Sequence, residues 1–268
     1  RLPKIAMFGG SVFLFPHPVK ELADFLKGHN MHINYDAAHV AGLIAGGEFQ
    51  DPLREGVDTM TMSTHKTLFG PQGGLVLASE KNAEAIKKAT FPGLTSSHHI
   101  HHMAAKAITF AEALEFGKDY ASQTIKNAKA LAVALNDLGF KVLGEKKGFT
   151  QSHQTVVNVL DYGDGGKIEA DLEKANIIVN RQLIPGDIKA KRHYMHPGGI
   201  RLGSSEVTRL GMKESEMQQI ASFIKNIIID KKDGKDIAKQ IAEFRKKYQK
   251  TQYCFDNKLG AYEYVKLR

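Results

Sequence analysis

The sequence contains a single cysteine, Cys254, among 268 residues, so no disulfide can form within the chain. It also lacks an apolar run that approaches the ~20 residues needed to cross a membrane. A basic-then-apolar leader with a small-residue cleavage site is absent as well, and nothing in these residues suggests secretion. Scarce cysteine is typical of proteins in reducing compartments. We therefore expect a cytoplasmic protein with no membrane partner.

Positive charge is in excess, and much of that excess lies near the C-terminus. Lys and Arg number 37 against 29 Asp and Glu, which gives a formal net charge of +8. Such a balance suits binding of anionic small molecules as well as binding of nucleic acid. The C-terminal cations fit a solvated helix face, and no nucleic-acid-binding motif or aromatic stacking platform accompanies them. They are Lys231, Lys232, Lys235, Lys239, Arg245, Lys246, Lys247 and Lys250.

The first third of the chain alternates between short apolar runs and segments with helical spacing. This pattern predicts strands separated by helices, and it indicates an α/β domain whose ligands bind just beyond the strand ends. The predicted strands are Lys4–Gly10, His32–Asp36, Val57–Met62 and Gly74–Ala78, and the predicted helix is Val19–Leu26.

From about residue 98 to residue 140 the apolar spacing becomes helical, and a second α/β pattern follows. Its predicted strands are Phe140–Leu143, Thr155–Leu160, Ile177–Val179 and Ile200–Gly203, and its predicted helices are Lys167–Lys174 and Lys213–Ile229. We expect a mainly parallel or mixed sheet in part of a large domain, residues 1–115. A smaller α/β domain, 116–230, and a charged C-terminal helix and tail, 231–268, would follow.

A lysine stands after one predicted strand, between hydroxyl groups and a glycine-rich turn. Residues 63–67 read Ser-Thr-His-Lys-Thr, and residues 70–74 read Gly-Pro-Gln-Gly-Gly. A lysine that reacts with a carbonyl must be neutral, and burial or nearby positive charge lowers a lysine pKa enough to supply that form. Lys66 therefore fits a covalent cofactor site, although most lysines in polar turns are simply solvated.

A carboxylate stands at the end of an earlier predicted strand. Residues 34–42 read Asn-Tyr-Asp-Ala-Ala-His-Val-Ala-Gly, and the separation of Asp36 from Lys66 suits one βαβ step. An enzyme of pyridoxal 5'-phosphate (PLP) pairs the pyridine nitrogen with a carboxylate, because the protonated ring is the electron sink. Asp36 and Lys66 supply such a pair. Capping a helix is the commoner use of a strand-end aspartate.

Both segments resemble the serine hydroxymethyltransferase family, whose signature is an Asp-x-Ala-His-x-Ala-Gly run followed by Thr-His-Lys-Thr-Leu-x-Gly-Pro-x-Gly-Gly. The resemblance continues in order through residues 91–93, 126–130, 175–180, 199–203 and 208–209. It implies the PLP-dependent transferase fold type I and a homodimer with the active site at the subunit interface. It also implies interconversion of serine and glycine, with transfer of a one-carbon unit to a reduced pterin. The carrier would be tetrahydrofolate or, as in archaeal members, tetrahydromethanopterin.

The resemblance implies a role for five residues of the two segments. Lys66 would hold the cofactor covalently, Asp36 would bind the pyridine nitrogen, and His39 would lie beside the ring and its phenolic oxygen. His65 would help to bind the phosphate, with the hydroxyl of Thr64 nearby.

Two further residues receive roles from the same resemblance. Ser11, which follows a Gly-Gly turn, would hydrogen-bond the phenolic oxygen of the cofactor. Arg201 would bind the substrate carboxylate, which suits a planar guanidinium that can donate two parallel hydrogen bonds. Taken without the family pattern, Arg201 could equally form a salt bridge between domains.

Three features depart from the family pattern. Residues 94–102 read Leu-Thr-Ser-Ser-His-His-Ile-His-His where the family has a glycine-rich run, and Gln72 replaces a frequent arginine. The histidines raise the alternative of a metal site, but no cysteine or carboxylate completes a usual zinc set, so we expect no metal. The family's chain is longer at its N-terminus. We therefore expect these 268 residues alone to be incomplete for activity.

Two other functions stay open at this point. One is a PLP-dependent aldolase of the same fold that cleaves threonine-like amino acids without a pterin. The other is a non-catalytic, basic nucleic-acid-binding protein, whose RNA binding would depend steeply on salt.

Overall fold

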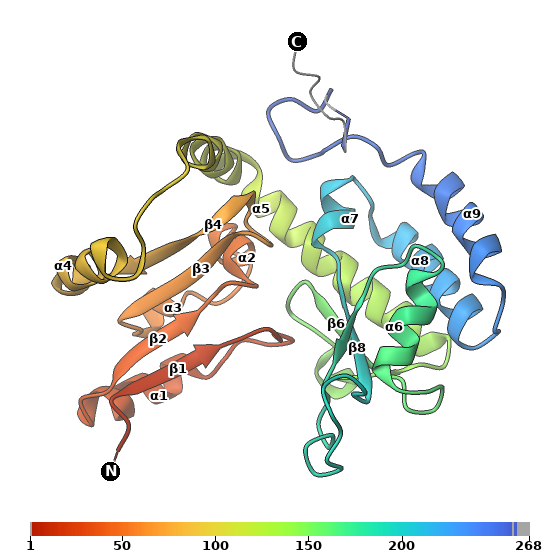
Figure 1. Ribbon diagram of the computed structural model, residues 1–268, viewed down its shortest axis with the longest axis horizontal. Helices are drawn as coiled ribbons and strands as arrows, with labels where there is room; N and C mark the ends of the chain where they lie inside the picture. Colours follow the sequence, from red (N-terminus) through yellow and green to blue (C-terminus); the bar gives the residue numbers. More distant parts are fainter. Residues whose placement is uncertain (1, 259, 262–268) are drawn as a thin grey trace. The chain divides into compact units, whose positions relative to one another are not determined.

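The computed structural model describes residues 2–258, 260 and 261, and the chain divides into two compact units, Arg1–Ala121 and Ser122–Arg268 (Figure 1). A long helix, α5 (Ile100–Asp137), begins in the first unit and ends in the second. The assignment of 1–115, 116–230 and 231–268 as separate domains stays a prediction. No helix in the described part of the chain is long and apolar enough to cross a membrane.

The first unit is built on a mixed sheet with the strand order β1-β2-β3-β4. Strands β1 (Ile5–Gly9), β2 (His32–Asp36) and β3 (Thr59–His65) run parallel, and β4 (Phe69–Ala78) returns antiparallel to β3. This arrangement confirms the expected mainly parallel or mixed sheet. Because the first three strands run the same way, their carboxyl ends share one edge of the sheet.

Short helices connect these strands, and their ends follow from local sequence. The helix α3 (Pro52–Glu55) begins at Asp51, whose side chain accepts a hydrogen bond from the backbone N–H of Arg54. Proline occupies its first turn, and Gly56 ends it with a left-handed φ of 115°. The other helices of this unit are α1 (Val19–Gly28), α2 (Ala41–Ala45), α4 (Glu80–Lys88) and the irregular turn η1 (Ala89–Leu94). Helices α1 and α3 pack together beside β2 and β3 (Figure 1).

The second unit contains an antiparallel sheet with the strand order β5-β6-β8-β7. Its strands are β5 (Lys141–Val142), β6 (Gln154–Asn158), β7 (Asn180–Gln182) and β8 (Gly199–Gly203). Its helices are α6 (Gly165–Glu173), α7 (Ser205–Arg209), α8 (Glu214–Ile228), α9 (Gly234–Arg245) and the short η2 (Glu145–Lys147). Helix α8 lies between α6 and α9 (Figure 1) and buries Met217, Ile224 and Ile228 in the core.

One predicted strand lies three residues before the strand that the structure shows. The apolar run Ile177–Val179 is not a strand, and the chain pairs with β8 only at Asn180–Gln182. The preceding residue, Asn176, has a left-handed φ of 61°, and the side chain of Ile178 is 77% exposed. The run therefore crosses from α6 to the sheet as a connection, so apolar composition alone misplaces the strand.

Candidate functional site

Three of the predicted site residues follow the carboxyl ends of three neighbouring strands. Ser11 comes two residues after β1, Asp36 is the last residue of β2, and Lys66 directly follows β3. Parallel pairing aligns Gly9 with Asp36 and Asp36 with Thr61. Adjacent strands lie about 4.8 Å apart. The sheet therefore places a hydroxyl, a carboxylate and an amine at or just beyond the carboxyl ends of neighbouring strands, with Lys66 five residues beyond the register partner of Asp36.

A glycine allows the ends of β1 and β2 to approach closely. Gly9 has a left-handed φ of 94°, and a Cβ atom at this position would lie 2.2 Å from the backbone oxygen of Asp36. No residue with a side chain fits so close to a backbone carbonyl. Asp36 itself accepts a hydrogen bond of 3.0 Å from the backbone N–H of Ala38 through Oδ1. This bond holds the turn that leads to His39.

A buried threonine, Thr67, links the Lys66 segment to the His39 segment through two hydrogen bonds. The hydroxyl of Thr67 donates to the backbone oxygen of His39 at 2.9 Å and accepts from the backbone N–H of Gly42 at 3.0 Å. Thr67 is 1% exposed, so water does not compete for these bonds. A Cβ atom on Gly42 would lie 2.1 Å from the backbone oxygen of Thr67. The two segments are therefore in direct backbone contact.

Thr64 and His65 lie at the end of β3 and differ in exposure. Thr64 is buried, and its hydroxyl donates to the backbone oxygen of Pro71 at 2.7 Å. His65 is exposed, and its Nδ1 atom accepts from the backbone N–H of Gly73 at 3.5 Å. Both side chains thus support the glycine-rich turn between β3 and β4. Their contact with a phosphate stays a prediction.

Arg201 lies in the second unit, in the middle of β8. Its guanidinium donates to Oδ1 of Asn180 at 3.0 Å, across the register pair that joins β7 and β8. Partial burial lowers the pKa of Arg201 from its usual value, but arginine remains a cation at any physiological pH. Ser11, Asp36, His39, Thr64, His65 and Lys66 all lie in the first unit.

Three of the four histidines before and at the start of α5 crowd one another. The ring centroids of His99, His101 and His102 lie 4.3 to 5.5 Å apart. Desolvation and the neighbouring histidines and Lys106 lower the pKa of His102. Within residues 2–258, 260 and 261, no three histidine, cysteine, aspartate or glutamate side chains are arranged to hold a metal ion.

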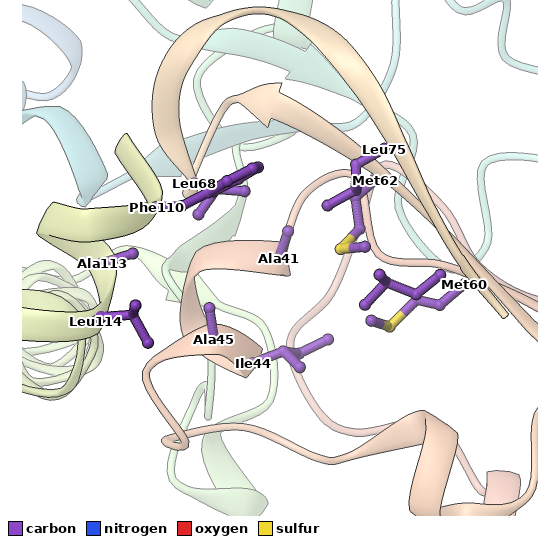
Figure 2. A pocket seen from close by; sticks show the side chains of 11 residues that line it. Ala41, Ile44, Ala45, Met60, Met62, Leu68, Leu75, Phe110, Ala113 and Leu114 are labelled. Atoms are coloured by element: carbon purple, nitrogen blue, oxygen red, sulfur yellow. The ribbon is translucent and has the colours of Figure 1, made fainter. Parts of the chain in front are cut away.

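An apolar pocket of about 310 Å³ lies beside α2 (Figure 2). Its walls come from α2, β3, β4 and α5, and Figure 2 shows Ile44, Met60 and Leu114 among the side chains around it. The full lining is Ala41, Ile44, Ala45, Met60, Met62, Leu68, Leu75, Leu77, Phe110, Ala113 and Leu114. Because no polar or titratable side chain lines it, this pocket suits apolar groups and offers nothing for proton transfer.

Comparison with known proteins assigns the family. Residues 1–224 match the family described as "Serine hydroxymethyltransferase". The chain belongs to the serine hydroxymethyltransferase family.

Relatives in this family share most of the chain's sequence. It is 80% identical over 268 residues to the serine hydroxymethyltransferase of Nitrosopumilus maritimus, and covers 61% of that protein. It is 55% identical over 260 residues to that of Pyrococcus furiosus, where 95% of this chain covers 60% of the relative. The chain therefore spans about three fifths of the length of the curated relatives it matches.

A solved structure places the fold. The chain is similar to the crystal structure of L-threonine transaldolase from Pseudomonas fluorescens in its internal aldimine state, with a TM-score of 0.86 and 34% sequence identity. The match covers 96% of this chain and 58% of that one. It confirms the expected α/β fold of PLP-dependent enzymes of fold type I.

The chemistry at the strand ends fits PLP. The cofactor needs an amine for its aldehyde and a carboxylate for its ring nitrogen; Asp36 ends β2, and Lys66 directly follows the adjacent strand β3. The motif contains Thr67, but the sequence did not reveal that its hydroxyl links the two segments through hydrogen bonds. Its position directly after the lysine was the signal that could have indicated it.

Proposed function

We propose that the protein containing this chain is a serine hydroxymethyltransferase. It interconverts serine and glycine with PLP and transfers a one-carbon unit to a reduced pterin. The observation that carries this proposal is the shared edge where Ser11, Asp36 and Lys66 follow three neighbouring strands. Membership of the family supports the same reaction. The chain spans about three fifths of the length of its relatives, so the activity of the whole protein is part of this proposal.

Each residue at the strand ends then has a chemical task. When bound, PLP supplies an aldehyde for amines and a ring that accepts electrons from the substrate. The amine of Lys66 would hold the cofactor through its aldehyde. The carboxylate of Asp36 would keep a proton on the pyridine nitrogen, which favours the ring as an electron acceptor. Ser11 and His39 would bind the phenolic oxygen.

Arg201 binds the carboxylate of serine or glycine in this proposal. Its guanidinium donates to Asn180, and a planar guanidinium can bind a carboxylate through two parallel N–H groups. Holding the carboxylate would orient the bonds at Cα and thereby favour the breaking of one of them.

A second candidate is cleavage of threonine-like amino acids without a pterin. The observation that favours it is the likeness to an L-threonine transaldolase. Identity of 80% to a serine hydroxymethyltransferase favours the pterin-dependent reaction instead. Assaying serine cleavage with and without tetrahydrofolate or tetrahydromethanopterin separates the two, because only the first reaction requires the pterin for turnover.

The protein is also proposed to act as a cytoplasmic homodimer. Leu94 and Leu114, which lie before and within α5, are 87% and 90% exposed, and Ile100 and Met103 are exposed near them in sequence. Apolar side chains in such numbers suit a protein interface. The lone Cys254 suits a reducing compartment. Light scattering of the full-length protein tests the dimer.

The direct test of this function uses the full-length protein with PLP, serine and either pterin. We expect formation of glycine that depends on the pterin, and loss of at least about 10³-fold in kcat when Lys66→Ala removes the amine. Serine cleavage that proceeds equally well without any pterin would contradict the proposed reaction.

A further inference from the structure

The loop between β1 and α1, residues 10–18, carries Ser11 and has no regular secondary structure of its own. Its first anchor is Gly9, which pairs with Asp36 in the sheet. Its middle is held by Phe13, which is 1% exposed and packs on the rings of Tyr35 and His17, at centroid distances of 5.9 and 4.8 Å. A loop without regular secondary structure depends on such side-chain anchors to keep one conformation.

The far end of this loop is held by one amide side chain. Oε1 of Gln50 accepts from the backbone N–H of His17 at 2.8 Å, and Nε2 of Gln50 donates to the backbone oxygen of His17 at 3.1 Å. The amide of Gln50 thus pairs with His17 as the backbone of a neighbouring strand would. Among the standard side chains only asparagine and glutamine present both an acceptor and a donor in this way, and asparagine is one methylene shorter.

Two more hydrogen bonds fix the orientation of the same amide. The hydroxyl of Tyr35 donates to Oε1 of Gln50 at 2.7 Å, and Nε2 of Gln50 donates to Oε2 of Glu55 at 2.6 Å. All four hydrogen-bonding positions of the amide are therefore used. Burial, together with the carboxylates of Glu55 and Asp36, raises the pKa of Tyr35, so its hydroxyl remains a donor. Tyr35 precedes Asp36, and the amide thereby links the loop to the strand that ends in Asp36.

We propose that Gln50 is a positioning residue of the cofactor site, which places Ser11 beside Asp36 by holding the loop 10–18 at His17. This inference rests on the proposed function, because the task of Ser11 is to bind PLP. Gln50 does not touch the reacting atoms and acts only through the loop. No motif in the sequence marks it: it lies fourteen residues after Asp36 in a connection with no signature.

The test uses the full-length protein and three variants. Gln50→Leu removes all four hydrogen bonds at similar volume, and Tyr35→Phe removes one and keeps the ring. Gln219→Leu is the matched control, because Gln219 is exposed on α8. Amide hydrogen exchange of residues 11–17 is measured without cofactor, and the dissociation constant of PLP is measured by absorbance titration.

We expect exchange at the His17 amide to be about tenfold faster in Gln50→Leu, as for one or two lost hydrogen bonds, and less so in Tyr35→Phe. The PLP dissociation constant should rise about tenfold in Gln50→Leu and stay unchanged in Gln219→Leu. In a Ser11→Ala background, Gln50→Leu should add less than about twofold, because both changes remove the same contact.

Three outcomes would overturn the inference. Exchange in Gln50→Leu equal to that in Gln219→Leu would show that Gln50 does not hold the loop. Faster exchange with an unchanged PLP dissociation constant would show that Gln50 does not act through Ser11. The same conclusion would follow if Gln50→Leu raised the PLP dissociation constant as much in the Ser11→Ala background as in the wild type. A wild-type protein that binds no PLP would overturn the proposed function itself, and this result is distinct from those three outcomes.

Discussion

At the scale of single residues, backbone contacts set how closely the segments around Lys66 and Asp36 approach. Gly9 meets the backbone of Asp36, and Gly42 meets the backbone of Thr67. Neither glycine has a side chain that could take part in catalysis. Each is the residue that lets a polar segment lie against its neighbour with no side chain between them.

Replacing Gly42 with alanine tests this close approach. The new Cβ would lie 2.1 Å from the oxygen of Thr67, so the two segments must separate. We expect Gly42→Ala to lower the free energy of unfolding by about 2–4 kcal/mol, within the range of severe steric changes. Gly28→Ala, where a Cβ meets nothing within 4 Å, is the control and should change stability by less than about 1 kcal/mol. Urea denaturation measures both, and equal values would contradict the contact.

The hydroxyl of Thr67 is open to a similar test. Thr67→Val keeps the shape but removes the hydroxyl that accepts from the backbone N–H of Gly42, which should cost about 1–3 kcal/mol of unfolding free energy. Thr67→Ser should retain most of the stability, because it keeps the hydroxyl. Thr90→Val, at an exposed position, controls for the substitution itself. Thermal unfolding in which Thr67→Val matches Thr90→Val would show that the hydroxyl does not fasten the two segments.

At the scale of elements, apolar periodicity predicts most strands but misses those with polar or glycine-rich sequence. Strand β2 has the predicted bounds, His32–Asp36. Strand β3 continues through the polar residues 63–65, and β4 begins five residues before the predicted Gly74–Ala78. The hydrogen-bond ladder between β3 and β4 extends both strands through these polar and glycine-rich residues, because cross-strand backbone hydrogen bonds need no apolar side chain. The site residues stay predictions that come from their motif, whereas the contacts of Gln50 appear only once distant segments meet.

The carboxylate of Asp164 at the start of α6 predicts that the stability of the fold depends on pH. The side chain of Asp164 accepts from the backbone N–H of Lys167 at 3.0 Å, and this bond lowers the pKa of Asp164, with a further lowering by His196 and an opposing effect of burial. Because the pKa of Asp164 is lower in the folded protein than its ordinary value of 3.8, the ionised carboxylate stabilises the fold at pH values above 3.8. This stabilisation is lost as the pH falls through the pKa of the folded protein.

Asp164→Ala should therefore cost about 1 kcal/mol of unfolding free energy at pH 7 and progressively less below pH 4. Asp171→Ala, in the same helix but away from its start, is the control. Urea denaturation at pH 7 and pH 3 measures the difference. A cost that stays constant between these pH values would rule out the ionised cap.

At the scale of the whole molecule, apolar side chains remain uncovered in the first unit. Ile5 and Met7 on β1 and Val76 and Leu77 on β4 are exposed, and both strands lie at the edges of the described sheet. Exposed apolar edges of this kind promote association. The relatives are longer than this chain, and the 268 residues leave about two fifths of their length unrepresented.

The isolated 268-residue chain should therefore differ from the full-length protein. We expect it to bind a hydrophobic dye strongly, to self-associate and to bind PLP at least about tenfold more weakly, because apolar surface and part of the site are left open. Dye fluorescence and sedimentation compare the two proteins. Equal PLP affinity in both would show that residues 1–268 hold the cofactor unaided.

The central claim is that the amine of Lys66 holds PLP at the strand ends where Asp36 lies. The most direct measurement is borohydride reduction of the PLP-loaded full-length protein, followed by peptide mass spectrometry. We predict that the pyridoxyl group is found on Lys66, and that Lys66→Ala eliminates both this adduct and the visible absorbance band. An adduct on another lysine, or a band that survives Lys66→Ala, would contradict the assignment of the site.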